Sequence, residues 1–156
     1  MRRKDREVTD KAKIEEIIRG CHCCRLGFND DGEVYILPLN FGWEKKEDTY
    51  VLYFHGAKEG RKIDLIGKNP KVGFEMDRGY SLRPGEIGGE CTASFQSIIG
   101  NGVVEMVENK DEKIHGLTLI MNHNAGPKAW TFSEPMLQAV AVFRMTVEKM
   151  SCKEHE

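Results

Sequence analysis

The sequence predicts a mainly β protein with short helices, closed as a barrel. Three observations support this fold class. Six or seven segments are rich in the β-branched and aromatic residues that strands favour. Turn-forming residues separate these segments, and the pair Asp31-Gly32 is typical of a tight hairpin. Most of the links between segments have hairpin length, which favours a barrel over a doubly wound sheet.

The first part of the chain predicts one helix and three strands. A helix is expected from Thr9 to Arg19, because its isoleucines recur at helical spacing, Thr9 or Asp10 can cap it, and Gly20 follows it. The expected strands are Cys21 to Gly27, Glu33 to Phe41 and Thr49 to His55.

The middle of the chain predicts a short helix from Gly60 to Lys68, ended by Asn69-Pro70. Asp77 to Glu90 holds four glycines and a proline, so we expect a variable loop there. The strands expected around this loop are Lys71 to Met76, Cys91 to Ile99 and Gly102 to Val107.

The last part predicts a moderately amphipathic helix from Asp111 to Asn122, with an irregular segment from Asn122 to Trp130. Ser133-Glu134-Pro135 opens a short helical turn, since proline fits the first helical position. Val140 to Val147 closes the fold as a strand, and we expect its apolar start, Val140 to Phe143, to be an edge that a second copy covers. No repeat or linker interrupts the chain, so we expect a single domain over residues 1–156.

Composition narrows the functional classes. With 156 residues, 40% apolar and 31% charged, the chain resembles a soluble globular domain. A net charge of −2 gives no reason to expect a nucleic-acid partner, and we read the basic start Met1 to Lys4 as a solvated tail. The longest apolar runs are far shorter than the about 20 residues that a membrane span needs. No cationic start leads into an apolar stretch, so we expect a cytoplasmic protein.

The cluster Cys21-His22-Cys23-Cys24 does not predict a metal site. Zinc sites pair one cysteine knuckle with a second knuckle or a histidine pair, and none follows. In a strand, Cys21 and Cys23 would face away from His22 and Cys24, so the four groups would not converge. We expect structural cysteines, with metal or redox chemistry as the alternative.

Nucleotide motifs are absent from the sequence. There is no glycine-rich loop that ends in Gly-Lys-Ser or Gly-Lys-Thr, and Gly100-Asn101-Gly102 is followed by Glu105 where the dinucleotide fingerprint needs its third glycine. A cofactor bound by a barrel is still compatible with these absences.

The segment Tyr53 to Lys62 could hold a phosphate. It runs from a strand end through a glycine-containing turn into the start of a helix, where backbone N–H groups and the cations Arg61 and Lys62 lie together. A solvated turn is the alternative. Gln96 and Ser97, on a later strand, could complete such an anion site.

Pro38 lies inside the strand that ends at Phe41 and therefore indicates an edge or a bulge. An edge would leave backbone groups free to bond a flat heteroaromatic ligand. An ordinary edge strand is the equal alternative.

Taken together, these stretches resemble the FMN-binding split-barrel proteins of the pyridoxamine 5′-phosphate oxidase-like superfamily, and within it the nitroimidazole-resistance (Nim-type) branch. The matching segments follow one another in the expected order: Met1-Arg2-Arg3-Lys4-Asp5-Arg6, Cys24 to Gly27, Tyr35 to Gly42, Leu52 to Lys62, Asn69 to Val72, and Ser97 to Gly102.

The resemblance implies a six-stranded, Greek-key split barrel that forms a homodimer, with one FMN at each end of the subunit interface. It implies that Arg61 and Lys62 bind the phosphate, that Gln96 and Ser97 add contacts on the phosphate side, and that the segment His123 to Trp130 reaches the partner's flavin. The remaining implied flavin-binding residues are Pro38, Leu39, Asn40 and Phe41 along the ring, and His55, Gly56 and Ala57 beside the phosphate and ribityl chain.

The implied activity is that of an FMN-dependent oxidoreductase passing electrons to a small-molecule acceptor, a nitroaromatic of the 5-nitroimidazole type, with His55 as the candidate catalytic residue. A non-catalytic flavin or haem carrier on the same fold is the alternative. Pyridoxamine-phosphate oxidation is disfavoured, because the C-terminus lacks a matching basic pair. Two features depart from the family: Gly56 stands where serine is frequent, and the loop from Gly79 to Gly89 has no counterpart.

Overall fold

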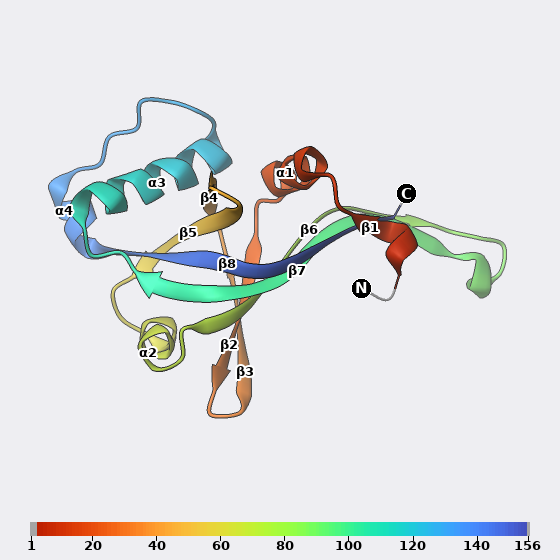
Figure 1. Ribbon diagram of the computed structural model, residues 1–156, viewed down its shortest axis with the longest axis horizontal. Helices are drawn as coiled ribbons and strands as arrows, with labels where there is room; N and C mark the ends of the chain where they lie inside the picture. The colour runs from red at the N-terminus through yellow and green to blue at the C-terminus, as the bar shows by residue number, and fades with distance from the viewer. Residues whose placement is uncertain (1–2, 156) are drawn as a thin grey trace.

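The computed structural model describes residues 3–155, so Met1 and Arg2 of the basic tail, and Glu156, lie outside the described residues. Strands dominate the chain, and two short 3-10 turns accompany four α-helices (Figure 1). The strands are β1 (Glu7–Val8), β2 (Cys24–Asp30), β3 (Glu33–Leu39), β4 (Gly42–Lys46), β5 (Thr49–Ala57), β6 (Lys71–Arg83), β7 (Thr92–Met106) and β8 (Val140–His155). The helices are α1 (Lys11–Gly20), α2 (Arg61–Lys68), α3 (Lys110–Ala125) and α4 (Glu134–Ala139), with 3-10 turns at Lys4–Arg6 and Gly88–Glu90.

The strands of the described chain form one antiparallel sheet in the order β3-β2-β6-β7-β8-β5-β4, and β1 pairs with β8. The neighbours β5-β8-β7-β6 make a Greek key, because the chain leaves β5 through α2 and skips two strands before β6. This arrangement confirms the mainly β split barrel. The seven expected strands correspond to six strands of the structure, β2, β3 and β5 to β8, whereas the short β1 and β4 were not predicted.

Several local predictions are confirmed. Asp10 caps α1, since its carboxylate accepts a hydrogen bond from the backbone N–H of Ala12 at 3.0 Å. The isoleucines of α1 are buried in the main core. Asp31 and Gly32 both have positive φ, 51° and 96°, as the two-residue hairpin turn between β2 and β3 requires.

The predictions for β6 and β7 were partly wrong. Much of the loop expected from Asp77 to Glu90 is strand, because β6 continues to Arg83 and pairs with β7 across a register shift between Arg78 and Ser81. The two strands expected from Cys91 to Val107 are one strand, β7. Its pairing with β8 shifts register between Asn101 and Gly102. A Cβ at Gly102 would collide with the backbone of Thr146, so glycine there allows β8 to pack closely across the irregularity.

The expected edge strand at Val140 to Phe143 was also wrong. This segment begins β8, which lies between β7 and β5, and Val142 and Phe143 are fully buried. It therefore cannot be the surface that a second copy covers. The path of the sheet ends instead at β3 and β4, and the place of Pro38 on β3 confirms the edge expected from that proline.

Two hydrophobic cores position the helices. The larger core fills the inside of the sheet and includes α1 and α2, while the smaller core lies between α3 and the strands β5 and β8. Helix α3, which extends beyond the predicted Asn122 to Ala125, packs closely on β4 and β5. In Figure 1, α3 and α4 lie at one end of the molecule and the β6–β7 hairpin projects at the other.

Candidate anion-binding site at the end of β5

The connection from β5 to α2 brings a strand end against a helix start. Gly60 precedes α2 with φ 115°, a conformation that glycine adopts without strain. No side chain caps the first turn, although the carbonyl of Gly60 accepts a hydrogen bond from the N–H of Ile63 at 2.9 Å. The first backbone N–H groups of a helix have no partner within it, so this end of α2 is open to an anion.

Lys62 lies directly over the backbone of Gly56. A Cβ at position 56 would stand 2.6 Å from Lys62 Cε and 3.1 Å from Nζ, so the bare glycine makes the room that the lysine occupies. The side chain is half-buried and forms no hydrogen bond or ion pair with residues 3–155. A positive charge is thus held at the end of β5 without a carboxylate from the described chain, which suits the phosphate of a ligand.

Arg61, although adjacent, points elsewhere. Its guanidinium donates to the carboxylate of Asp30 at 2.8 Å and lies 4.5 Å from the ring centroid of Tyr35. These contacts hold α2 against the β2–β3 hairpin. The pair expected to bind phosphate together is therefore divided between Lys62 at β5 and Arg61 at the hairpin.

His55 lies on the other face of β5 from Gly56. Alternate residues of β5 belong to different cores: Leu52 and Phe54 to the larger one, Val51 and Tyr53 to the one beneath α3. By this alternation His55 and Ala57 continue the α3 side. The His55 side chain is exposed, but nearby protein partly desolvates it and lowers its pKa, which favours the neutral imidazole.

The segment Pro38 to Phe41 links the edge strand β3 to β4. In the β4–β5 pairing Gly42 stands opposite Tyr53, so Phe41 lies just before the point where β4 meets β5. Pro38 is exposed on the edge strand, Leu39 is half-buried, and the ring of Phe41 is fully buried. The structure thus places this segment beside the end of α3, while Gly56 and Lys62 lie at the end of β5.

Asn124 and His123 of α3 hold this segment. The amide of Asn40 donates to the side-chain oxygen of Asn124 at 3.2 Å, and Asn124 donates to the carbonyl of Phe41 at 3.0 Å. His123 packs on Phe41, with ring centroids 4.5 Å apart. Asn124 itself was missed by sequence reasoning, because no local pattern links the end of α3 with a residue more than 80 positions earlier.

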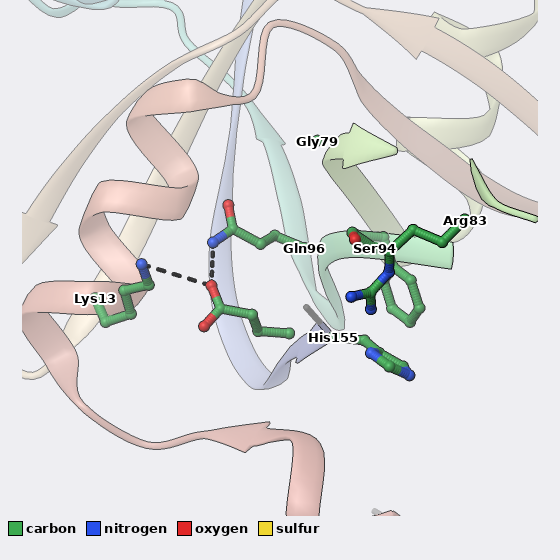
Figure 2. Close-up of a pocket in the computed structure, with 8 residues that line it drawn as sticks. Lys13, Gly79, Arg83, Ser94, Gln96 and His155 are labelled. Carbon is green, nitrogen blue, oxygen red and sulfur yellow. Dashed lines mark hydrogen bonds and ion pairs between the residues drawn. The ribbon is translucent and has the colours of Figure 1, made fainter. Parts of the chain in front are cut away.

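Within one copy of the chain, Gln96 and Ser97 lie away from Lys62 and the β5–α2 connection. Gln96 lines a polar cavity of about 330 Å³ together with Lys13, Arg83 and His155 (Figure 2). Its amide oxygen accepts a hydrogen bond from Arg78 at 2.5 Å, and its amide nitrogen donates to Glu154. The cavity beside the β5–α2 connection, about 410 Å³, includes Lys58 and Ile63 but neither Gln96 nor Ser97.

Ser97 stands opposite Asp77 on β6 and Lys153 on β8. Because side chains alternate along a strand, the Ser97 side chain faces away from that of Gln96. Neither residue joins Lys62 within one subunit. A phosphate site that combines these groups needs Gln96 and Ser97 from another copy.

The cysteine cluster does not converge. Cys21 and Cys24 are buried and Cys23 is half-buried, and all cysteines of the described chain are free thiols. Burial raises the pKa of Cys21 to about 11 and raises that of Cys24 further, which disfavours the reactive thiolate. Among residues 3–155 no group of three or more histidine, cysteine or acidic side chains is placed to hold a metal ion.

The Greek-key sheet and the open, cationic turn at the end of β5 define a split-barrel protein of the pyridoxamine 5′-phosphate oxidase type. A family model described as pyridoxamine 5′-phosphate oxidase matches residues 10–154. The chain belongs to this family. No curated protein matches it in a sequence search.

Solved structures agree on the fold. A proposed 5-nitroimidazole antibiotic resistance protein from Bacteroides thetaiotaomicron is 31% identical, over 95% of this chain and 86% of that chain, with a TM-score of 0.81. The flavocytochrome Anf3 from Azotobacter vinelandii is 16% identical, with 100% and 72% coverage and a TM-score of 0.80. An FAD and haem binding protein from Mycobacterium smegmatis is 13% identical, with 97% and 74% coverage and a TM-score of 0.83. The last two likenesses show the fold alone.

Proposed function

We propose that this chain binds FMN and acts, as a homodimer, as an FMN-dependent oxidoreductase whose acceptor is a nitroaromatic of the 5-nitroimidazole type. One observation carries the flavin assignment: the unpaired Lys62 ammonium over the bare backbone of Gly56, beside the uncapped start of α2. The resistance protein from Bacteroides thetaiotaomicron supports the acceptor class. Bound FMN would supply the electron transfer.

The residues of the chain have separate tasks in this proposal. Lys62 and the first N–H groups of α2 bind the phosphate, while Arg61 fixes α2 to the hairpin through Asp30. The backbone of residues 38–41 lies along the ring, and Asn124 holds its carbonyl end in place. Gln96 and Ser97 reach the phosphate side from the second subunit. His55, neutral near pH 7, is the group we propose to exchange a proton with the acceptor.

The test is flavin retention after desalting, followed by visible absorbance. FMN should be retained more tightly than riboflavin, which lacks the phosphate, and FAD should be compared directly with both. Lys62→Ala should weaken FMN binding by about 1.5–3 kcal/mol, or roughly 10- to 150-fold, because a charge-assisted contact is lost. Lys68→Ala, at the far end of the same helix, is the matched control and should bind as the parent does. Equal affinity of the Lys62 variant and the control would place the phosphate elsewhere.

The activity has its own test. The FMN-loaded protein, supplied with a chemical reductant, should consume a 5-nitroimidazole over many turnovers, and the nitro absorbance should fall. A flavin that is reduced once but never cycles with the nitro compound would contradict the oxidoreductase assignment and favour the carrier, for which haem should then be tested.

A further inference from the structure

A cavity of about 410 Å³ lies where β5 and β7 end and β8 begins. In Figure 1, α2 and the start of α3 lie on opposite sides of this end of the sheet. Among residues 3–155, the charged side chains that line the cavity are Lys58, just after β5, Glu108, shortly after β7, and Lys113, near the start of α3. We call it the lysine pocket, and its other lining residues are apolar: Ile63, Met106, Val107, Val140, Ala141 and Val142. Its volume lies within the roughly 300–1,000 Å³ of pockets that bind small organic molecules.

Two ammonium groups line the lysine pocket without a carboxylate partner. The Lys58 side chain forms no hydrogen bond or ion pair with residues 3–155, and Lys113 forms no ion pair with them. Burial, and after it the nearby charge of Lys58, lowers the pKa of Lys113, while Glu108 acts in the opposite direction. Like charges repel, so holding the two lysines near each other costs free energy that an anion between them would offset.

The Lys113 ammonium group is held in position by the protein. One of its N–H groups donates to the backbone carbonyl of Leu137, whose side chain is buried in the smaller core. An ammonium group has three N–H donors, so two of them remain for a ligand. Because this donor is already fixed, binding an anion does not require it to be ordered first.

The charge and the surface of the lysine pocket define the class of ligand. Lys58 and Lys113 together with Glu108 leave one excess positive charge, which a monoanion neutralises and a phosphate dianion exceeds. A carboxylate has two oxygens that can each accept a hydrogen bond from an ammonium group. The apolar wall suits a hydrocarbon body, as in most small-molecule pockets. A small molecule with an apolar body and a single carboxylate meets both requirements.

The lysine pocket is separate from the phosphate site proposed at Lys62. Val140 and Val142 of its wall pack in the smaller core, on the α3 side of the sheet. Lys62 instead covers Gly56, which lies two positions after Phe54 of the larger core and therefore faces the other side of the sheet. A ligand in the pocket and a phosphate at Lys62 therefore do not compete for the same lysine.

We infer that the lysine pocket binds a small organic monocarboxylate, with the carboxylate between Lys58 and Lys113 and the apolar body against the ends of β7 and β8. The site does not depend on the proposed flavin chemistry, because none of the side chains proposed to bind FMN lines the pocket. The carboxylate is thus a second ligand, bound at a site of its own in each copy of the chain.

Calorimetric titration of the flavin-free protein tests the class of ligand. The probe is 2-naphthoate, and it is compared with its neutral analogue 2-naphthamide and with the dianion 2-naphthyl phosphate. 2-Naphthoate should bind at least tenfold more tightly than 2-naphthamide, because the amide lacks the charge that the two ammonium groups attract. It should also bind more tightly than the phosphate. No measurable binding of 2-naphthoate, equal binding of the amide, or tighter binding of the phosphate would overturn the inference.

Substitutions test the two lysines. Lys58→Ala and Lys113→Ala should each weaken 2-naphthoate binding at least tenfold, while circular dichroism shows an unchanged fold. Lys113→Ala also removes the hydrogen bond to Leu137, so the exposed Lys58 carries the test if that variant does not fold. Lys110→Ala removes the same charge from α3 at a lysine that pairs with Glu134 and does not line the pocket, so it should bind as the parent does. Unchanged binding in Lys58→Ala, or an equal loss in the Lys110 control, would overturn the inference.

FMN retention by the same proteins separates this site from the flavin site. Lys58→Ala and Lys113→Ala should retain FMN as the parent does, and Lys62→Ala should bind 2-naphthoate as the parent does. Displacement of 2-naphthoate by FMN, or loss of FMN from the pocket variants, would make the pocket part of the flavin site and overturn the inference. A parent that binds 2-naphthoate but not FMN would contradict the proposed function and leave this inference intact.

Discussion

His123 shows how a single residue at the site is held in one protonation state. Its Nε2–H donates to the carbonyl of Cys21 at 2.6 Å, its ring packs on Phe41, and burial, with the nearby His22, lowers its pKa. The neutral ring therefore fixes the chain just before β2 against the end of α3. A charged ring would be less well accommodated there.

The pH dependence of stability follows from this lowered pKa. The unfolded chain binds the proton more readily than the folded one, so the free energy of unfolding should be fully present above the ordinary histidine pKa of about 6.5 and should fall as the pH drops below it. Urea unfolding at pH 7.5 and 5.5 measures this loss. His123→Gln keeps an N–H donor without a charge and should therefore reduce the loss of stability. Part of the loss should remain in this variant, because the pKa of His55 is also lowered. An equal loss in the parent and the variant would contradict this account.

At the scale of elements, glycines set how closely α3 packs on the sheet. A Cβ at Gly42 of β4 would collide with the backbone of Leu119 and Ile120, and one at Gly116 would stand 2.6 Å from the Tyr53 ring. The helix can therefore lie directly on β4 and β5, where Asn124 reaches the carbonyl of Phe41. The position of the site segment depends on this close approach.

Gly42→Ala should destabilise the protein by about 1–3 kcal/mol, because the backbone of α3 has to move away and the small core opens. Gly67→Ala is the matched control: no atom lies within 4 Å of a Cβ there, and alanine in a helix should stabilise by about 0.5–1 kcal/mol. Thermal or urea unfolding of both variants checks the opposite signs. A Gly42 variant as stable as the parent would mean that α3 is not held at this distance.

Elements with local signals could be predicted from the sequence. The cap at Asp10, the turn at Asp31-Gly32 and the proline on β3 are each decided by a few adjacent residues. Lys62 and Gly56 could also be associated, since they lie within one strand–turn–helix unit. The projecting end of the β6–β7 hairpin, residues 79–93, which we call the arm, was missed because its glycines and proline resemble a loop, although cross-strand pairing continues to Arg83. No sequence pattern shows which strand lies beside which, so the central place of β8 and the distance of Gln96 from Lys62 required the structure.

For the whole molecule, β8 is the strand on which the sheet depends. It pairs with β7 along most of its length, with β5 through residues 140–146, and with β1 near its end. Its adjacent residues Val142 and Phe143 pack into different cores, Val142 into the smaller and Phe143 into the larger. Strand β8 thus joins the end of the sheet that carries the candidate site to the end that carries the arm. Only the end with the candidate site has a packed core on both faces of the sheet. No helix among residues 3–155 is both long and apolar enough to cross a membrane.

Hydrogen exchange should show this unequal support. Amides of β8 from Phe143 to Thr146, where the strand pairs with both β5 and β7, should exchange most slowly, because they open only when the whole fold does. Amides of the arm should exchange fastest in dilute protein, since its strands pair only with each other. Mass spectrometry of peptides measures both rates, and an arm protected as strongly as β8 would mean that its stability comes from within the chain.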